Sequence, residues 1–403
     1  MKVRITHRGS AYGIIRCMGI KRCNNIMDFR GVAKRRLPAP VFHYIDGGAD
    51  DEWSLRRNTE AFEDYELLPS HLSDVSDVDL KSTLFGQPVD WPVMIAPTGA
   101  SKLFHRDGEP AVARAAEKFG MPYSLSTVGT TSIEDVAAIG AHPKVFQIYV
   151  LKDRSLTRNF IERSKESGYT ALCLTVDTPV AGNRERDAVY GMMATAKPAL
   201  ASVPSMLRHP GWLYRAVIRS DMELVNIMQA LPDMKFTDMS VKEFLDGQLD
   251  RSLTWKDVEW LAAEWGGPLI IKGVQTVDDC RKAANSGATA VMLSNHGGRQ
   301  LEASPAPVDC IAAVADALHD RLEIICDGGI RRGTHIVKAL ALGANACSIG
   351  RGYLYPLAAG GQAGVEKALE LLSEEVRRTM ALLGCDSVAQ LDSAYVQNRR
   401  RLP

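Results

Sequence analysis

The sequence predicts an α/β protein, a (β/α)₈ TIM barrel with a helical extension at its N-terminus and a long insertion after the fourth strand. Three observations support this. Eight short apolar runs alternate with helix-like segments from residue 90 onward. The runs are continuously hydrophobic, as strands covered on both faces must be. They recur over about 260 residues, the usual size of such a barrel. A doubly wound sheet is the alternative, but it would not need eight near-regular units.

The predicted strands are short, and helices connect most of them. In chain order they are Pro92–Ala96, Tyr123–Val128, Val145–Val150, Ala171–Val176, Pro268–Lys272, Ala290–Leu293, Leu322–Cys326 and Ala346–Ile349. Amphipathic segments at 108–120, 132–139 and 334–344 predict helices between strands. The last segment reaches Gly343, a natural helix stop before the eighth strand.

The regular spacing fails between the fourth and fifth strands, where an insertion covers about residues 188–252. Loops of this length are usually functional. Within it, residues 200–220 mix aromatic and aliphatic side chains with arginines, a composition that suits the surface of a membrane. The alternative is a lid packed on the barrel mouth or at a subunit contact. Both interpretations stay open at this point.

The ends of the chain predict two tails around one barrel domain at 28–390. Residues 1–27 carry six lysines and arginines and no acid, which predicts a dispensable basic tail, disordered or absent from the native protein. Residues 391–403 are predicted to form a C-terminal tail. Over the whole chain, 48 basic residues balance 48 acidic ones, so no global field indicates a nucleic-acid partner.

The eight cysteines are scattered, with no CxxC pair, and Cys173, Cys326 and Cys347 lie within predicted strands. Buried, reduced thiols are therefore expected, which is typical of a cytoplasmic protein. No apolar run reaches the ~18 residues that a membrane-spanning helix needs. No spacing of residues indicates a metal site.

The segment Ser294-Asn295-His296-Gly297-Gly298-Arg299-Gln300 is the most informative motif. A histidine can move a proton near neutral pH, and a guanidinium can bind a carboxylate through two parallel hydrogen bonds. The glycines allow a sharp turn and the close approach of a flat ligand. Alone, the segment is more typical of a Gly-rich turn with a capping asparagine and a solvated arginine, so the rest of the chain must decide.

Polar residues at the other strand ends favour the functional interpretation, since catalytic groups of this fold lie there. Lys272 ends a buried strand, where an unpaired ammonium would be costly. Asp177 is placed to orient a histidine, although a turn aspartate is about as common. Gln147 and Thr175 suit the edge of a heteroaromatic ring or the backbone. Tyr149, like Tyr44 near the N-terminus, carries little information alone.

The loops after the seventh and eighth strands predict a phosphate site. They read Asp327-Gly328-Gly329 with Arg331, and Gly350-Arg351-Gly352. In this fold the two loops usually hold a phosphate between backbone N–H groups and a helix N-terminus. The alternative, a tight turn with surface arginines, does not explain two such loops on consecutive strands.

Taken together, these residues resemble the FMN-dependent L-2-hydroxy acid dehydrogenase and oxidase family, which includes glycolate oxidase, L-lactate dehydrogenase and mandelate dehydrogenase. The resemblance covers the chain from about residue 28 and rests most specifically on SNHGGRQL. Supporting motifs are FHYIDGGADDE, IAPTG, FQIYV, LTVDTPVAGNRERD, IIKG, DGGIRRG and IGRG.

The resemblance implies FMN as cofactor and a role for each site residue. His296 would be the base, with Asp177 steadying the imidazolium and Tyr149 contacting the substrate hydroxyl. Arg184 and Arg299, assisted by Tyr44, would bind the substrate carboxylate. Lys272 would stabilise the reduced flavin. The ring would be held by Pro97, Thr98, Gly99, Ser126, Gln147, Thr175 and Ser294, and the ribityl phosphate by Asp327, Gly329, Arg331, Gly350 and Arg351.

Two positions bear on substrate and acceptor. Glycolate oxidase-like members have Trp where this chain has Val128, and Ala where it has Gly99. With the small Ala181, this predicts a pocket that accepts more than glycolate. L-Lactate is the expected substrate, with L-mandelate-like or longer acids next. Gly99 resembles the lactate and mandelate dehydrogenases, which favour a quinone or cytochrome over oxygen. The family also implies a homotetramer. The composition of the 200–220 segment adds peripheral contact with the inner face of the cytoplasmic membrane as one of its two interpretations, beside the lid.

Three alternatives to this prediction remain. The first is an oxygen-using 2-hydroxy acid oxidase. The second is another FMN- or phosphate-binding barrel, such as a type 2 isopentenyl diphosphate isomerase, which shares the phosphate loops but lacks SNHGGRQL with its partner Arg184. The third is a barrel used as a sensor or scaffold, which predicts losses at catalytic positions; none of the key residues is missing.

Overall fold

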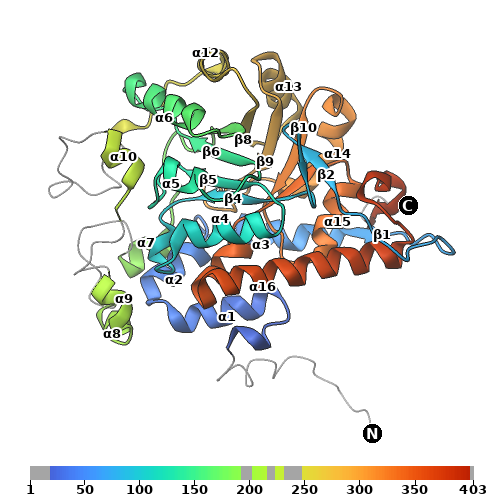
Figure 1. Cartoon of the computed structure of the whole chain (residues 1–403), viewed down its shortest axis with the longest axis horizontal. Helices are drawn as coiled ribbons and strands as arrows, with labels where there is room; N and C mark the ends of the chain where they lie inside the picture. The colour runs from blue at the N-terminus through green and yellow to red at the C-terminus, as the bar shows by residue number, and fades with distance from the viewer. Residues whose placement is uncertain (1–18, 192–201, 216–222, 231–246, 400–403) are drawn as a thin grey trace, which may run out of the picture.

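The computed structural model describes residues 19–191, 202–215, 223–230 and 247–399. Eight parallel strands form a closed barrel surrounded by helices (Figure 1). The strands are β4 (Val93–Thr98), β5 (Tyr123–Ser126), β6 (Lys144–Ile148), β7 (Ala171–Thr175), β8 (Leu269–Val274), β9 (Ala290–Ser294), β10 (Glu323–Asp327) and β11 (Ala346–Ile349). They follow each other in chain order around the barrel, and β11 pairs with β4 to close it. The predicted fold is confirmed.

All eight predicted strands are present, with ends that differ by a few residues. β8 runs two residues past Lys272 through an irregularity between Lys272 and Val274, where Gly273 has φ +105°. β4 likewise continues to Thr98 across a register shift with β5. Such irregularities bend a strand end and redirect its side chains, which hydrophobicity alone does not report.

Helices cover the outside of the barrel. They are α4 (Gly108–Lys118), α5 (Ile133–Ala137), α6 (Arg154–Glu166), α12 (Trp255–Trp265), α13 (Val277–Asn285), α14 (Pro307–Leu318), α15 (Gly333–Ala341) and α16 (Arg351–Leu383), with the 3₁₀ turn η4 (Ser101–Leu103) before α4. The helices predicted at 108–120, 132–139 and 334–344 are α4, α5 and α15. Ser132 caps α5 by accepting from the N–H of Asp135 at 3.0 Å. α16 is interrupted at Gly360 and Gly361, where the backbone leaves helical geometry.

An N-terminal helical extension packs beside the barrel. It consists of η2 (Ile20–Arg22), α1 (Ile26–Arg36), α2 (Ala39–Asp46), α3 (Trp53–Glu60) and η3 (Ala61–Asp64). α1 lies along α16 (Figure 1). Cys23, Ile26 and Phe29 are buried in this contact. The predicted basic tail at 1–27 therefore needs correction in its last part, because residues 20–27 belong to the packed extension; residues 1–18 lie outside the described residues.

Two small antiparallel sheets complete the fold. β1 (Tyr65–Leu67) pairs with β12 (Val396–Asn398), which follows the 3₁₀ turns η7 (Val388–Gln390) and η8 (Ser393–Tyr395). The predicted C-terminal tail from residue 391 thus contains a paired strand. β2 (Ser82–Leu84) and β3 (Gln87–Val89) form a hairpin. Leu84, Phe85 and Val89 of this hairpin pack with barrel-interior residues such as Met94 and Ile270. They close the end of the barrel at which the strands begin.

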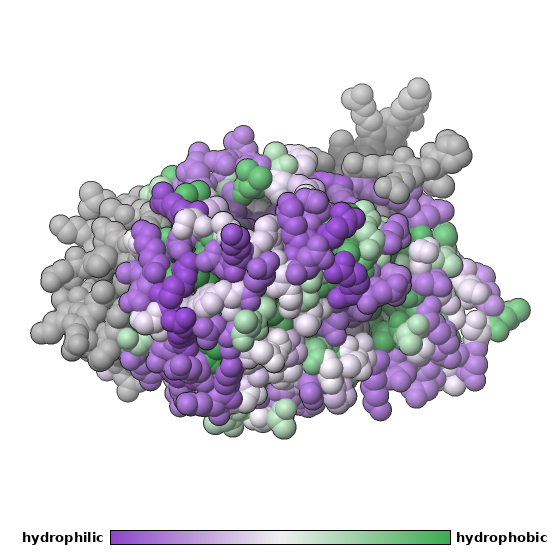
Figure 2. All heavy atoms as spheres, turned by 90° about the horizontal axis from the view of Figure 1, so that it is seen from above, coloured by the Kyte–Doolittle hydropathy of each residue, from purple (hydrophilic) through white to green (hydrophobic). Residues whose placement is uncertain are grey.

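Two hydrophobic cores result, one inside the barrel and one between the strands and the helices. The predicted burial of strand cysteines is confirmed, since Cys173, Cys326 and Cys347 have no exposed surface. On the face seen in Figure 2, hydrophilic residues predominate and hydrophobic ones form small separate patches. Most of the apolar side chains of the described residues are therefore inside.

Among its described residues, the insertion after β7 includes the short helices α7 (Glu185–Tyr190), α8 (Val203–Leu207), α9 (Pro210–Tyr214) and α10 (Val225–Ala230). Residues 192–201, 216–222 and 231–246, and with them part of the 200–220 segment, lie outside the described residues. Trp212 donates to the carbonyl of Leu103 at 2.8 Å, and Ser205 accepts from the N–H of Ala39 at 2.9 Å. No described helix is both long and apolar enough to cross a bilayer.

Candidate functional site

The polar residues at the carboxyl ends of the strands converge on one cavity of about 580 Å³. Those that line it are Tyr44, Pro97, Thr98, Gly99, Ser126, Tyr149, Arg184, Lys272, His296, Arg299, Asp327, Gly329, Arg331, Gly350 and Arg351. Gln147, Thr175, Asp177 and Ser294 lie behind this wall, hydrogen bonded within the same cluster. The predicted site residues are thus brought together in space.

His296 is oriented by Asp177. Its Nδ1 lies 2.9 Å from an oxygen of the Asp177 carboxylate, so Nε2 is the ring nitrogen left for the cavity. Burial raises the pKa of Asp177, but the nearby His296 and Lys272 outweigh it and hold the pKa below its ordinary value. The pair is therefore a carboxylate facing an imidazole, which stabilises the ring when it takes up a proton.

The backbone at His296 is unusual, with φ +58°, a conformation that non-glycine residues rarely adopt. Four hydrogen bonds support this turn. The N–H of His296 donates to the Ser294 hydroxyl at 3.0 Å, and the N–H of Gly298 donates to the Asn295 side chain at 3.0 Å. Asn295 also exchanges two amide hydrogen bonds of 2.7 Å with Asn58 of α3. Sequence reasoning missed Asn58, because it lies 237 residues away in the extension.

Two arginines surround Tyr44 at one end of the cavity. The guanidinium carbons of Arg299 and Arg184 lie 4.8 Å and 5.9 Å from the centre of its ring. Burial and the neighbouring Arg184 lower the pKa of Arg299 to about 10. Such a lowering means that positive charge here is under-compensated. An anion such as a carboxylate would supply the missing negative charge.

The C-terminal end of α2 forms this wall of the cavity. Arg299 donates to the carbonyl oxygens of Tyr44 and Gly47, and Arg351 donates to those of Ile45, Gly47 and Gly297, at 2.6 to 2.8 Å for Arg351. The last carbonyls of a helix have no partner within it and carry partial negative charge. The two arginines therefore cap α2 and fix Tyr44 beside the cavity.

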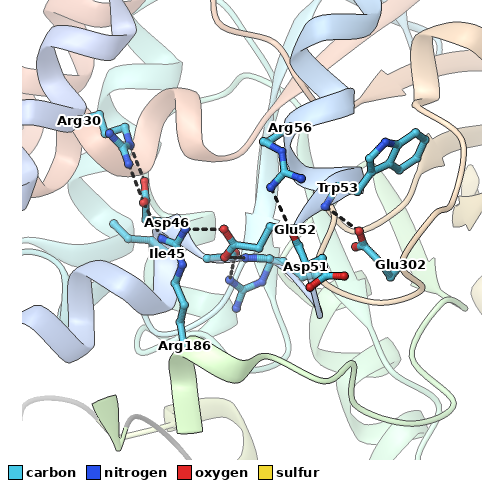
Figure 3. A network of polar contacts seen from close by, with 12 residues as sticks. Arg30, Ile45, Asp46, Asp51, Glu52, Trp53, Arg56, Arg186 and Glu302 are labelled. Atoms are coloured by element: carbon cyan, nitrogen blue, oxygen red, sulfur yellow. Dashed lines mark hydrogen bonds and ion pairs between the residues drawn. The ribbon is translucent and has the colours of Figure 1, made fainter. Parts of the chain in front are cut away.

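A charged network holds the same segment from outside (Figure 3). Arg30 binds the Asp46 carboxylate, with one contact of 2.8 Å, and Arg186 bridges Asp46 at 3.1 Å and Glu52. Glu52 in turn accepts from the N–H of Gly48 at 2.9 Å. Since Arg186 belongs to α7, this network fastens the insertion to the extension. Asp46 and Glu52 of the FHYIDGGADDE motif thus have a structural explanation.

Lys272 sits in a buried triangle with Asp327 and Ser294. Its Nζ lies 2.9 Å from both, and the Ser294 hydroxyl donates to Asp327 at 2.7 Å. Burial alone would lower the pKa of Lys272, but Asp327 and Asp177 more than offset this and raise it. Lys272 is therefore a fixed cation at the cavity wall, able to stabilise negative charge that develops beside it.

Hydrogen-bonding side chains extend along the strand ends from β5 to β7. The buried Gln147 amide accepts from the Ser126 hydroxyl at 2.8 Å and donates to Thr175 at 3.0 Å. Tyr149 also lines the cavity, and burial raises its pKa, which keeps the hydroxyl protonated and able to donate. A row of this kind can satisfy the polar edge of a flat heterocycle.

The loops after β10 and β11 fit a phosphate. Arg331 and Arg351 are partly buried in the cavity wall, and this burial lowers the pKa of both. Both arginines donate to carbonyl oxygens, and among the described residues no directly bound acid neutralises their charge. Gly329 has φ +74°, and a Cβ there would clash with the carbonyl oxygen of Asn58. These residues fit the ribityl phosphate of FMN, whose negative charge would balance the two guanidiniums.

Gly99 and Val128 are coupled in the structure. Both line the cavity, and a Cβ on Gly99 would clash with the Cγ2 of Val128. The β-branched Val128 therefore occupies the space that an alanine at position 99 would need. The two differences from glycolate oxidase-like members depend on each other, which the sequence positions, 29 residues apart, do not indicate.

Comparisons with known proteins agree with this geometry. The sequence profile of the FMN-dependent dehydrogenase family matches residues 33–398. An L-lactate dehydrogenase of Xanthomonas campestris is 42% identical over 368 residues, 90% of this chain and 94% of that protein. Rice glycolate oxidase 1 is 38% identical over 372 residues, 92% of this chain and 95% of that protein. The crystal structure of a monotopic membrane protein, (S)-mandelate dehydrogenase, superimposes with a TM-score of 0.87 at 35% identity, covering 94% of this chain and all of that one.

Proposed function

Because the chain belongs to the FMN-dependent dehydrogenase family, we propose that it oxidises an L-2-hydroxy acid, L-lactate in the first place, to the 2-oxo acid. The observation that carries this proposal is the His296–Asp177 pair in one cavity with Arg184 and with Arg299, whose pKa is lowered by burial and by Arg184. A base beside a carboxylate-binding pair is what removal of a proton from a 2-hydroxy acid requires.

Each predicted residue takes a role in this proposal. Arg184, Arg299 and Tyr44 bind the carboxylate and so place the hydroxyl-bearing carbon against the flavin ring. Tyr149 contacts the substrate hydroxyl. His296 takes a proton at Nε2, and Asp177 stabilises the resulting imidazolium at Nδ1.

FMN, when bound, supplies the acceptor for two electrons. The residues proposed to hold its ring are Pro97, Thr98, Gly99, Ser126, Gln147, Thr175 and Ser294, and those proposed to hold its phosphate are Asp327, Gly329, Arg331, Gly350 and Arg351. Lys272 places its positive charge at the wall where the ring gains electrons. Arg351 also caps α2, so its contribution to phosphate binding is mainly electrostatic.

The choice of L-lactate over glycolate rests on the space beside Gly99, Val128 and Ala181, which line the cavity with small side chains. L-Mandelate-like and longer acids are the second candidates, supported by the mandelate dehydrogenase likeness. For the electron acceptor we propose a quinone or cytochrome. Gly99 resembles the residue of the lactate and mandelate dehydrogenases at this position, and these enzymes favour such acceptors over oxygen.

An anaerobic substrate panel tests this proposal. Purified protein carrying FMN is mixed with glycolate, L-lactate, longer L-2-hydroxy acids and L-mandelate, and bleaching of the flavin band is recorded. We expect the fastest bleaching with L-lactate, and faster reoxidation by a quinone analogue than by oxygen. Bleaching by NADPH alone, or protein that cannot be loaded with FMN, contradicts the proposal.

We also propose a homotetramer that contacts the inner face of the cytoplasmic membrane through the 200–220 segment. Among its described residues, Leu207 and Tyr214 are exposed apolar side chains, 65% and 52% accessible, beside the exposed Arg208. Light scattering tests the oligomer. Sedimentation with anionic vesicles and release by high salt test the membrane contact. Protein that does not bind the vesicles supports the alternative, in which the segment is a lid on the barrel mouth or a subunit contact.

A further inference from the structure

The charges at the substrate end of the cavity leave one acid without an assigned role. Two acids are among the described residues that line the cavity, Asp187 and Asp327. Asp327 is bound by Lys272 at 2.9 Å. Asp187 belongs to α7, and its carboxylate is 3.5 Å from the guanidinium of Arg184.

Asp187 is buried, and the charges that act on its carboxyl group are those of Arg299 and Arg184. Its side chain is 12% exposed. Burial raises the pKa of Asp187 above its ordinary value, and the nearby Arg299 and Arg184 offset only part of this rise. The adjacent Arg186 does not compensate Asp187, because it is taken up by Asp46 and Glu52 (Figure 3). Asp187 therefore faces Arg184 and Arg299 as their negatively charged neighbour in the cavity.

We propose that Asp187 determines specificity: its carboxylate cancels one of the two arginine charges and restricts the site to 2-hydroxy acids with a single carboxylate. Two guanidiniums and one carboxylate leave a net charge of one, which one substrate carboxylate balances. A substrate with a second carboxylate would bring a further negative charge close to Asp187, while the charges of Arg184 and Arg299 are already balanced by Asp187 and the first carboxylate. This inference rests on the proposed function, since it concerns the same arginines.

The proposal gives a quantitative test, because Coulomb energy is proportional to the product of the charges. Replacing Asp187 by asparagine removes one negative charge with little change in shape. If a monoanion then binds tighter by about fivefold, a dianion in the same place binds tighter by about 25-fold, the square of the first factor. A general change in site geometry would affect both ligands alike.

Oxamate and oxalate are suitable probes, since they differ by an amide in place of one carboxylate. Their dissociation constants are measured at fixed ionic strength from the perturbation of the flavin absorbance of oxidised holoenzyme, for wild type and Asp187→Asn. The control is Glu185→Gln, which removes the same charge from an exposed side chain two residues away. We expect a much larger gain for oxalate than for oxamate in Asp187→Asn, and under twofold changes in Glu185→Gln.

A second measurement compares bleaching by L-lactate with bleaching by a 2-hydroxy dicarboxylate, L-malate. The ratio of rates should shift toward L-malate by about tenfold or more in Asp187→Asn. Equal gains for oxamate and oxalate, or no gain, overturn the proposal. If Asp187→Asn loses FMN, Asp187→Ser is measured in the same way; loss of FMN by both variants assigns Asp187 to folding and also overturns it. Wild-type holoenzyme that binds oxamate but is bleached by no L-2-hydroxy acid contradicts the proposed function instead.

Discussion

At the scale of single residues, the site depends on charges that are neutralised in part. His296 faces Asp177, and Lys272 faces Asp327, in pairs of 2.9 Å. Arg299 instead bonds to carbonyl oxygens and has a lowered pKa. In the proposed function, the paired His296 and Lys272 act in proton and electron transfer, and the incompletely neutralised Arg299 binds an anion. This division follows from burial, which makes each unpaired charge costly and therefore informative.

His296 provides the first prediction at this scale. Replacing it by alanine removes the base and should slow flavin reduction by L-lactate by about 10²- to 10⁴-fold. FMN should stay bound, because the proposed cofactor contacts come from other residues. Stopped-flow bleaching and the visible spectrum measure the two effects.

The matched control is His319→Ala, a histidine whose side chain is 66% exposed. It should reduce flavin as fast as the wild type. If the flavin of His296→Ala is still bleached as fast as that of the wild type, His296 is not the base.

At the scale of elements, the loops after the strands are shaped by contacts with the N-terminal extension. Gly329 after β10 approaches Asn58 of α3, and Asn58 in turn fixes Asn295 beside the catalytic histidine of the proposal. The carbonyls that end α2 hold Arg299 and Arg351. One face of the site is therefore built by helices α2 and α3 and not by the barrel.

A pair of glycine substitutions tests this contact. Gly329 and Gly168 have nearly the same backbone angle, φ +74° and +73°, but a Cβ on Gly168 meets nothing within 4 Å. In both alanine variants the left-handed backbone lowers the free energy of unfolding by about 1 kcal/mol. Gly329→Ala must in addition displace α3, so we expect it to lose FMN affinity by at least about tenfold.

Fluorescence of FMN released on dialysis measures that affinity, and thermal unfolding measures stability. Gly168→Ala should bind FMN normally with slightly lower stability. If the two variants bind FMN with equal affinity, α3 moves easily when Gly329 is replaced, and Asn58 does not position the loop.

At the scale of the whole molecule, the extension and α16 form one packed layer with the barrel. Phe29 of α1 is fully buried in this contact, whereas Met27, two residues earlier, is 51% exposed. A dispensable segment would not bury such a residue. The extension is thus part of the core, and its first described residues include buried Cys23 and Ile26.

This packing gives the third prediction. Phe29→Ala should lower the free energy of unfolding by about 3–5 kcal/mol, because it leaves a cavity in a closed interface. Met27→Ala should change it by less than about 0.5 kcal/mol. Urea unfolding followed by circular dichroism gives both values. A small loss for Phe29→Ala indicates that α1 separates from α16 without unfolding the barrel.

The sequence by itself determined the barrel, since continuous apolar runs and the helices between them are local patterns. It also determined which residue types stand at each strand end, and hence the His296, Arg299 and Lys272 assignments that the cavity brings together. Tertiary structure decided what depends on contacts between distant segments: the Asn58–Asn295 pair, the capping of α2 by Arg299 and Arg351, the clash that couples Gly99 to Val128, and the position of Asp187 beside Arg184 and Arg299. The physical reason is that periodicity reports which face of an element is buried, whereas charge balance and steric fit arise only when elements meet.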